Sequence, residues 1–247
     1  MPEMPVVHPD KAALSAAVGA RLLTAILDAQ AERGVAQLVL TGGSMGAASL
    51  AALRTQPGAS AIDWARVDLW WGDERVLPGG DPERNEVQAR EALIDHVPVD
   101  PARVHVMAPA PVGATADAEQ AASDYAAELG RAGYGTGDAP FFDVVMLGVG
   151  PDGHVASLFP GHPQQQAAGL VVAVHDSPKP PPTRVSLTFE ALRNTRQVWF
   201  LVSGNDKAEA VRLGLDGADP ERSSAAQVRG REATCWLVDA AAAGVTG

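Results

Sequence analysis

The chain has 247 residues and a formal net charge of −11, from 30 acidic and 19 basic side chains. This length suffices for one large hydrophobic core, so we expect a single domain spanning residues 1–247. Strong negative charge argues against binding to nucleic acid or to an anionic membrane, and any anionic substrate must be held by a local group of cations. The single cysteine, Cys235, excludes an intramolecular disulfide and a cysteine-rich zinc site.

The first ten residues, MPEMPVVHPD, show neither the basic nor the apolar region of a leader peptide. No apolar run is expected to approach membrane-spanning length. We therefore expect a cytoplasmic protein. Its oligomeric state is left open by the sequence, with a monomer preferred.

Helices and strands alternate along most of the chain. In chain order, the patterns predict a helix at 11–33, a strand at 37–40, a helix at 45–53, a strand at 67–71, a helix at 82–96, a weak strand at 104–107, a helix at 115–131, strands at 144–149, 170–174 and 198–202, a helix at 208–215 and a strand at 234–238. This alternation of strands and helices predicts an α/β fold with a doubly wound, mainly parallel sheet and helices on both faces.

A glycine-rich turn, Thr41-Gly42-Gly43-Ser44, joins the first predicted strand to the second helix. Free backbone N–H groups converge at such a turn, which favours binding of an anion such as phosphate. Residues 42–46 also match G-x-S-x-G, the nucleophile elbow, so a serine hydrolase using Ser44 and His154 is an alternative. Against it, no HGG-type oxyanion loop precedes the motif.

The stretch 141–162 carries the strongest chemical pattern, a buried strand followed by a glycine-rich turn that contains Asp152 and His154. Ligands of open α/β sheets bind at such strand ends. We expect residues 155–159 to form a short helix, whose positive N-terminal end would disfavour the imidazolium form of His154. Asp152 would then fix the tautomer of the ring, so the pair resembles a general base with its orienting group.

Two other interpretations of this stretch are weaker. Residues 148–153 match the dinucleotide motif G-x-G-x-x-G, with Asp176 near the expected ribose-binding position, but Pro160 and Pro163 would stop the required crossover helix. His154, His162 and His175 lie fairly close in sequence, but they lack H-x-x-x-H spacing and cysteine partners. We therefore expect no metal and no cofactor.

Charged residues also follow the other strands. Asp73, Glu74 and Arg75 follow the strand at 67–71, where a solvated loop is an equally good interpretation. The proline-rich run 177–182 resists helix and sheet and leads directly into Arg184, which we expect this stiff segment to aim. Residues 203–207 place Lys207 at the start of a helix, which repeats the anion-site pattern with a cation added.

With these residues in view, the chain resembles the 6-phosphogluconolactonase family over essentially its whole length. The matching segments are LTGGS at 40–44, WGDERVLP at 71–78 with Asn85 following, GVGPDGHVASLFPGH at 148–162, SPKPPPTRVSLT at 177–188, and Lys207 in SGNDKAEAV. The related glucosamine-6-phosphate deaminases share the TGGS-like loop and the DGH element. WGDER and SLFP resemble the lactonase, and the deaminase patterns DEY and FNEP are not found.

The resemblance implies metal-free hydrolysis of 6-phospho-D-glucono-1,5-lactone to 6-phospho-D-gluconate, a step of the oxidative pentose phosphate pathway. The implied roles are a general base for His154 and its orientation for Asp152. Gly43, Ser44, Arg184 and Lys207 would bind the phosphate, Arg75 would contact the phosphate or substrate hydroxyls, and Gly42 and Asp73 would contact the substrate. Asp73 could instead only balance Arg75. Turn amides of residues 150–153 are our hypothesis for oxyanion donors. A deaminase-like enzyme and a non-catalytic phosphosugar sensor remain alternatives.

Overall fold

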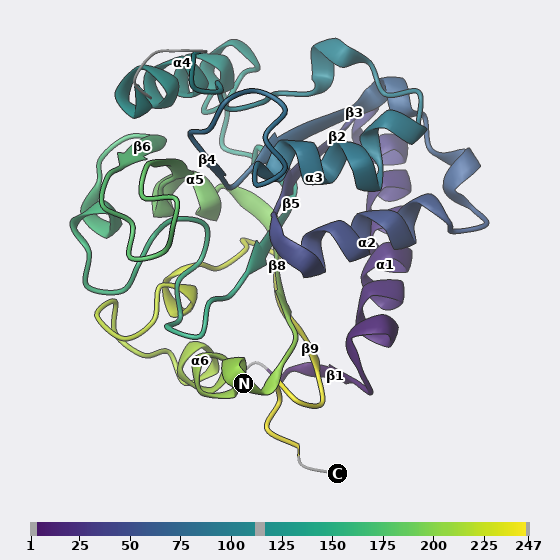
Figure 1. Ribbon diagram of the computed structural model, residues 1–247. Helices are drawn as coiled ribbons and strands as arrows, with labels where there is room; N and C mark the ends of the chain where they lie inside the picture. The colour runs from purple at the N-terminus through teal and green to yellow at the C-terminus, as the bar shows by residue number, and fades with distance from the viewer. Residues whose placement is uncertain (1–3, 112–116, 246–247) are drawn as a thin grey trace.

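A six-stranded parallel sheet forms the centre of the molecule (Figure 1). The computed structural model describes residues 4–111 and 117–245. The strand order is β1-β9-β8-β5-β2-β3, and each neighbouring pair is parallel. The strands are β1 (Val6–His8), β2 (Ala36–Leu40), β3 (Val67–Trp71), β5 (Phe142–Gly148), β8 (Thr195–Val202) and β9 (Ala233–Asp239). The predicted fold class is confirmed, although the short edge strand β1 was not predicted.

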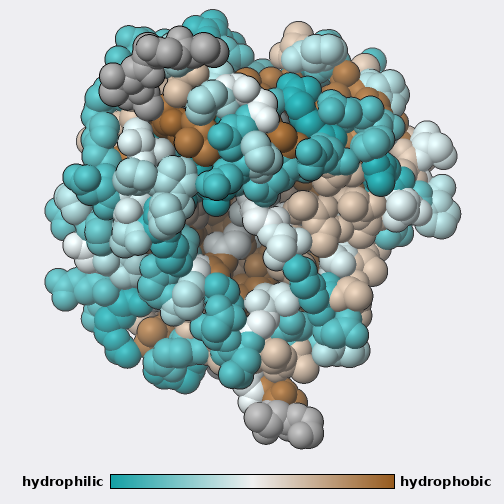
Figure 2. All heavy atoms as spheres, in the orientation of Figure 1, coloured by the Kyte–Doolittle hydropathy of each residue, from teal (hydrophilic) through white to brown (hydrophobic). Residues whose placement is uncertain are grey.

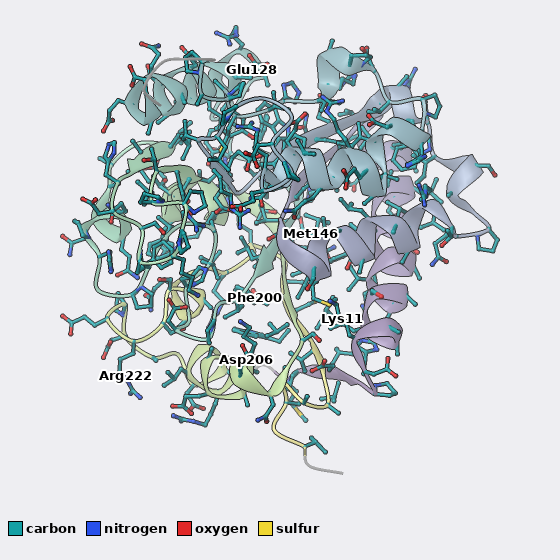
Figure 3. The ribbon with its side chains drawn as sticks, viewed as in Figure 1. Lys11, Glu128, Met146, Phe200, Asp206 and Arg222 are labelled. Atoms are coloured by element: carbon teal, nitrogen blue, oxygen red, sulfur yellow. The ribbon has the colours of Figure 1, made fainter. Side chains whose placement is uncertain are left out.

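Helices cover both faces of this sheet (Figure 1). One face carries α1 (Lys11–Arg33), α2 (Gly43–Arg54) and α3 (Asn85–Ala92), and the other carries α4 (Ala118–Arg131), α5 (Phe189–Arg193) and α6 (Ala208–Leu215). Successive strand side chains point to opposite faces. Met146 of β5 therefore packs in the core beneath α1 and α2, while Phe200 of β8 packs in the core on the opposite face (Figure 3).

Helix α1 has the bounds that its sequence signals predict. The Asp10 side chain accepts a hydrogen bond from the Ala13 backbone N–H, and Gly34 ends the helix in the left-handed conformation. By length and composition alone α1 could cross a membrane, so the expectation that no apolar run approaches that length was wrong. Leu14, Leu22 and other apolar side chains of α1 are fully buried in the core against the sheet, which accounts for the composition.

A second, three-stranded antiparallel sheet lies beside the carboxyl end of the main sheet. It has the order β4 (Asp73–Arg75), β7 (Arg184–Leu187), β6 (Val171–Val174). The segment at 170–174 was predicted as a strand, but it joins this small sheet rather than the main one. Strands β4 and β7 were missed because they are three and four residues long and carry charged side chains. Their pairing sets Arg75 directly opposite Arg184.

Several local predictions differ from the structure. Residues 155–159 form turns rather than a helix, since Ala156 has a φ of 49° and Pro160 lacks the N–H that would continue a helix. Residues 104–107 form no strand beyond one bridge between Val104 and Leu69. The helix predicted at 82–96 is α3 followed by a 3₁₀ turn, Ile94–His96. The predicted start of the fourth helix, residues 115–116, lies outside the described residues.

The topology reverses between β2 and β5. From β2 the chain continues outward to β3, whereas from β5 it continues to β8 on the other side. A crevice forms at the carboxyl ends of strands at such a switch point, where ligands of open α/β sheets bind. The Thr41 hydroxyl, after β2, accepts a hydrogen bond of 3.1 Å from the Gly148 N–H at the end of β5 and joins the two sides of the crevice.

Candidate active site

A pocket of about 320 Å³ lies at this switch point. Figure 2 shows a hollow near the middle of the surface that faces the viewer, with hydrophilic side chains along much of its rim. The lining residues come from the ends of β2, β4 and β5, from the start of α3, and from the loops before β7 and α6: Thr41, Gly42, Gly43, Asp73, Arg75, Asn85, Gly148, Val149, Gly150, His154, Ala156, Lys179, Pro180, Arg184 and Lys207.

His154 and Asp152 form a hydrogen-bonded pair at the pocket. The distance from His154 Nδ1 to Asp152 Oδ1 is 2.5 Å, and the ring packs on Phe159 with centroids 4.6 Å apart. An ionised carboxylate can only accept, so Nδ1 carries the shared hydrogen and Nε2 keeps its lone pair. The His154 side chain is 15% exposed. This arrangement can take a proton from a water molecule in the pocket.

The charge state of Asp152 supports this tautomer. Burial raises the pKa of Asp152, but the hydrogen bond and charge of His154 and the charge of Lys179 outweigh burial and hold that pKa well below its usual range. Asp152 is therefore ionised throughout the neutral range. The helix dipole expected beside His154 is missing, because residues 155–159 are not helical, so the carboxylate is the group that orients the ring.

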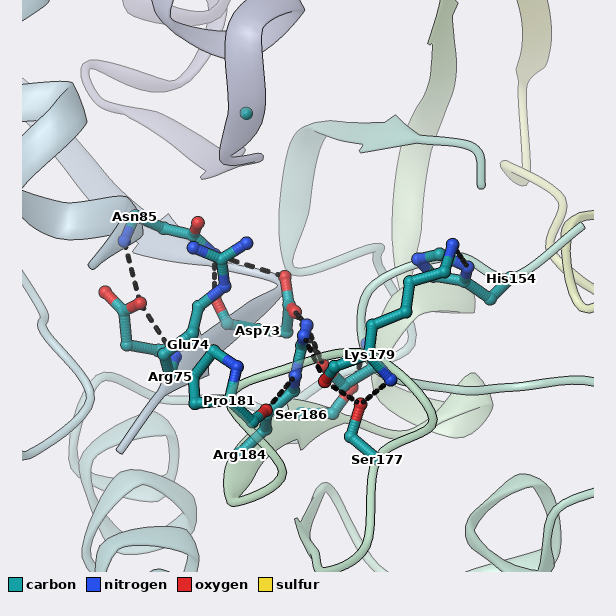
Figure 4. A network of polar contacts seen from close by, with 12 residues as sticks. Asp73, Glu74, Arg75, Asn85, His154, Ser177, Lys179, Pro181, Arg184 and Ser186 are labelled. Carbon is teal, nitrogen blue, oxygen red and sulfur yellow. Dashed lines mark hydrogen bonds and ion pairs between the residues drawn. The ribbon is translucent and has the colours of Figure 1, made fainter. Parts of the chain in front are cut away.

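The ammonium of Lys179 lies beside this pair. Its Nζ lies 3.3 Å from His154 Nδ1 (Figure 4). The same Nζ is 3.3 Å from Asp152 Oδ1. The loop that carries Lys179 is fastened by Arg184, which donates hydrogen bonds to the carbonyls of Lys179, Pro180 and Pro181 at 3.0–3.1 Å. The proline-rich run therefore aims Lys179, rather than Arg184, at the pair.

Asp73 is buried within a polar network beneath the pocket. Its Oδ2 accepts a 2.7 Å hydrogen bond from the Ser157 hydroxyl and lies 3.9 Å from Arg184 Nη1. Its Oδ1 has a long contact of 3.4 Å with Asn85 Nδ2, which leaves acceptor capacity on the pocket side. The ion-pair partner of Asp73 is thus Arg184, whereas Arg75 donates to the Glu83 carbonyl.

Glu74 points away from the pocket and holds α3 in place. Its two carboxylate oxygens accept the backbone N–H groups of Asn85 and Glu86 at 2.7 and 2.8 Å. Burial raises the pKa of Glu74, and the charge of Arg84 together with these N–H groups partly offsets that rise. The start of α3 is thereby fixed so that Asn85 faces Gly42, where a Cβ would lie 1.7 Å from Asn85 Oδ1.

Four cations surround the pocket of this acidic chain. Arg75, Lys179, Arg184 and Lys207 all line it, and Lys207 also contacts Asp206 at 3.1 Å. Burial lowers the pKa of Arg184, the charge of Asp73 raises it, and the charge of Arg75 lowers it further. Because like charges in one pocket repel, an anion bound among them is stabilised.

The glycine-rich turn reaches the pocket only in part. Gly42 and Gly43 line it, and Gly43 has a φ of 76° that a side chain would strain. The Gly43 N–H donates to Gln88 Oε1 at 3.0 Å. Ser44 is exposed, on the outer groove between α2 and α3, and is not among the residues that line the pocket.

The turn around His154 uses its own amides. The Gly150 N–H donates to the His154 carbonyl at 3.0 Å, and the Gly153 N–H donates to the Gly150 carbonyl at 2.9 Å. These two amides therefore point into the turn and not toward a bound carbonyl, which argues against them as oxyanion donors. Gly150 also packs directly on the pair, since a Cβ there would lie 2.0 Å from His154 Nδ1.

A family model described as glucosamine-6-phosphate isomerases/6-phosphogluconolactonase matches residues 9–236. The chain belongs to this family. It is 55% identical over 241 residues to the 6-phosphogluconolactonase of Streptomyces coelicolor, covering 96% of this chain and 92% of that protein. The solved structure of 6-phosphogluconolactonase from Thermotoga maritima has a TM-score of 0.81 at 27% identity, covering 96% of this chain and 99% of that one.

The fold alone does not separate the two activities that name the family. The structure of a monomeric glucosamine-6-phosphate deaminase has a TM-score of 0.79 at 20% identity and covers 100% of both chains. The pocket of this family member does not support the other hydrolase or cofactor interpretations. Ser44 makes no hydrogen bond to His154 within the described part of the chain, and Gly153 is followed by turns rather than a crossover helix.

The three histidines that lie fairly close in sequence have different partners in the structure, and His154 alone is paired with Asp152. His175 contacts Glu119 on the surface at 3.1 Å, and the His162 ring lies 5.8 Å from the Phe159 ring. Across residues 4–111 and 117–245, no group of three or more His, Cys, Asp or Glu side chains is placed to hold a metal ion.

Most of the pocket residues were predicted from the sequence, but Lys179 and Asn85 were assigned no role. Lys179 lies inside a segment that matches the family, and Asn85 follows another such segment. A lysine in a proline-rich run between two strands is a signal that could have identified Lys179. Ser157, fully buried beside Asp73, had no such signal because its position depends on how residues 155–159 turn.

Proposed function

We propose that this chain hydrolyses 6-phospho-D-glucono-1,5-lactone to 6-phospho-D-gluconate, the second step of the oxidative pentose phosphate pathway. The main support is geometric: an oriented histidine base faces a pocket that is lined by four cations. The chain is also 55% identical to a 6-phosphogluconolactonase. Attack of water on a neutral ester is assisted by a general base, and binding of a phosphorylated sugar is assisted by cations.

His154 Nε2 is the general base in this proposal. It takes a proton from water as the water oxygen bonds to C1 of the lactone, and the carbonyl electron pair moves onto the carbonyl oxygen. When the bond from C1 to the ring oxygen breaks, the imidazolium returns the proton to that oxygen, which becomes a hydroxyl. Asp152 remains ionised throughout and keeps Nδ1 protonated, as its lowered pKa requires.

The remaining pocket residues bind substrate in this proposal. The phosphate lies near Gly42, Gly43 and the start of α2, where Arg75 and Lys207 supply charged donors. The Ser44 hydroxyl is a further phosphate ligand that a side-chain rotation would have to bring inward. Asp73 accepts hydrogen bonds from sugar hydroxyls through Oδ1. Arg184 adds charge, although most of its N–H groups are engaged by protein oxygens.

We infer that the enzyme works in the cytoplasm, as a monomer and as one domain of residues 1–247. The family match over residues 9–236 supports one continuous unit. Light scattering after gel filtration would give a mass near 25.6 kDa for a monomer, and a doubled mass would contradict this.

The variant His154→Ala tests the base directly. Lactone opening is followed by proton release, with spontaneous hydrolysis subtracted, and we expect kcat to fall by about 10²–10⁴-fold because a general base is removed. Binding of 6-phosphogluconate, measured by calorimetry, should persist. The matched control is His175→Ala on the surface, which should keep wild-type activity. Undiminished turnover in His154→Ala would overturn the assignment.

A further inference from the structure

We propose that Lys179 is a further catalytic residue, which stabilises the negative charge that forms on the lactone carbonyl oxygen. This inference rests on the proposed hydrolase function. It also answers a question that the structure raises, because the Gly150 and Gly153 amides point into their own turn. A tetrahedral intermediate in ester hydrolysis needs a donor beside its oxyanion.

Lys179 is the pocket cation that lies at the reacting end. Its Nζ is 3.3 Å from the His154 ring and 3.3 Å from Asp152. The base must lie at C1, where the water attacks, whereas the phosphate on C6 is carried by the carbon on the other side of the ring oxygen. A cation beside the base is therefore placed for C1, whereas Arg75 and Lys207 are available for the phosphate.

The contacts of Nζ also leave it free to move. Asp152 Oδ1 already accepts the short hydrogen bond of His154, and Lys179 shares that oxygen at a longer distance. The Lys179 side chain is 37% exposed, so rotation about its flexible stem can carry Nζ from Asp152 to a bound carbonyl oxygen. The negative charge of the oxyanion supplies the attraction for that move.

The backbone of Lys179 is nevertheless held firmly. The Ser177 hydroxyl donates to its carbonyl at 2.9 Å and accepts from its N–H at 3.3 Å. Arg184, only 4% exposed, donates to the same carbonyl and to the next two. Arg184 is therefore a positioning residue for the loop, and the side chain of Lys179 swings from a fixed point.

Electrons and protons remain balanced in the reaction step when Lys179 takes part. As water attacks C1, the carbonyl electron pair moves to the oxygen, which then accepts a hydrogen bond from the ammonium. Lys179 keeps its proton throughout, and the proton taken by His154 goes to the ring oxygen. When the ring opens, the carboxylic acid at C1 loses the second proton of the water to solvent, and Lys179 faces the resulting carboxylate.

The test compares Lys179→Met and Lys207→Met on two substrates, the phosphorylated δ-lactone and glucono-1,5-lactone without phosphate. At the pH plateau, Lys179→Met should lower kcat by about 100-fold or more, the usual loss of an oxyanion donor, with KM changed less than threefold. The same loss should appear on the unphosphorylated lactone. Lys207→Met should raise KM for the phosphorylated lactone and have a smaller effect on the other.

Lys179→Arg restores the positive charge, so its kcat should be at least tenfold higher than that of Lys179→Met. Thermal melting shows whether each variant is folded. Three results would overturn the proposal: a plateau kcat of Lys179→Met within threefold of wild type, a loss confined to the phosphorylated lactone, or a shifted pH profile with an unchanged plateau. Wild-type protein that opens neither lactone would overturn the proposed function itself, which is a separate result.

Discussion

Replacing Gly150 by alanine should disable the enzyme while leaving the fold intact. A Cβ at this position would lie 2.0 Å from His154 Nδ1 and 2.4 Å from Asp152 Oδ1. Ordinary contact begins near 3.4 Å, so the imidazole must retreat by about 1.4 Å. A displacement of this size costs about 100-fold in rate, and we expect kcat of Gly150→Ala to fall at least that far.

The matched control is Gly72→Ala, between β3 and β4. The nearest atoms to its Cβ would be 3.7 Å away, which is ordinary contact, and neither glycine has a positive φ. Lactone opening and thermal melting are measured for both variants. We expect near-wild-type activity for Gly72→Ala and a Tm within about 4 °C of wild type for both. Wild-type kcat together with an unchanged Tm in Gly150→Ala would show that the added Cβ does not displace His154.

Two further variants test the electrostatics. Because the pKa of Asp152 is lowered in the folded state, its contacts stabilise the fold above the ordinary aspartate pKa and are lost as pH falls through the folded value. Asp152→Asn should therefore lower Tm at pH 7 and lower it by less at pH 3. Parallel curves of Tm against pH for wild type and variant would contradict this. Arg84→Met leaves the buried Glu74 unpaired, which should cost about 3–5 kcal/mol in urea denaturation. A loss below 1 kcal/mol would contradict that estimate.

Long periodic segments were predictable because local patterns determine them. Helix α1 begins after a capping aspartate and ends at a left-handed glycine, as its sequence indicates. The small sheet was not predictable, because β4 and β7 are short and carry charged side chains, and because β4 is held in the sheet by pairing with residues of β7 more than a hundred positions away. A three-residue strand has too few side chains to show an alternating pattern.

Some residues of the candidate site could be predicted from the sequence and others could not. Asp152 and His154 were identifiable because they are two residues apart in one turn, and their contact depends on that turn alone. The contact of Lys179 with this pair could not be inferred from spacing, since it depends on Arg184 fastening a loop from another sheet. The exposed position of Ser44 likewise follows from the orientation of α2, which tertiary packing sets.

The most direct test of the proposed function is lactone opening by the wild-type protein. The phosphorylated δ-lactone is supplied with spontaneous hydrolysis subtracted, with and without a chelator, beside glucosamine 6-phosphate as a second substrate. We expect fast opening that resists the chelator, and no ammonia from the amino sugar. Ammonia release, or no turnover of either sugar phosphate, would contradict the proposed function.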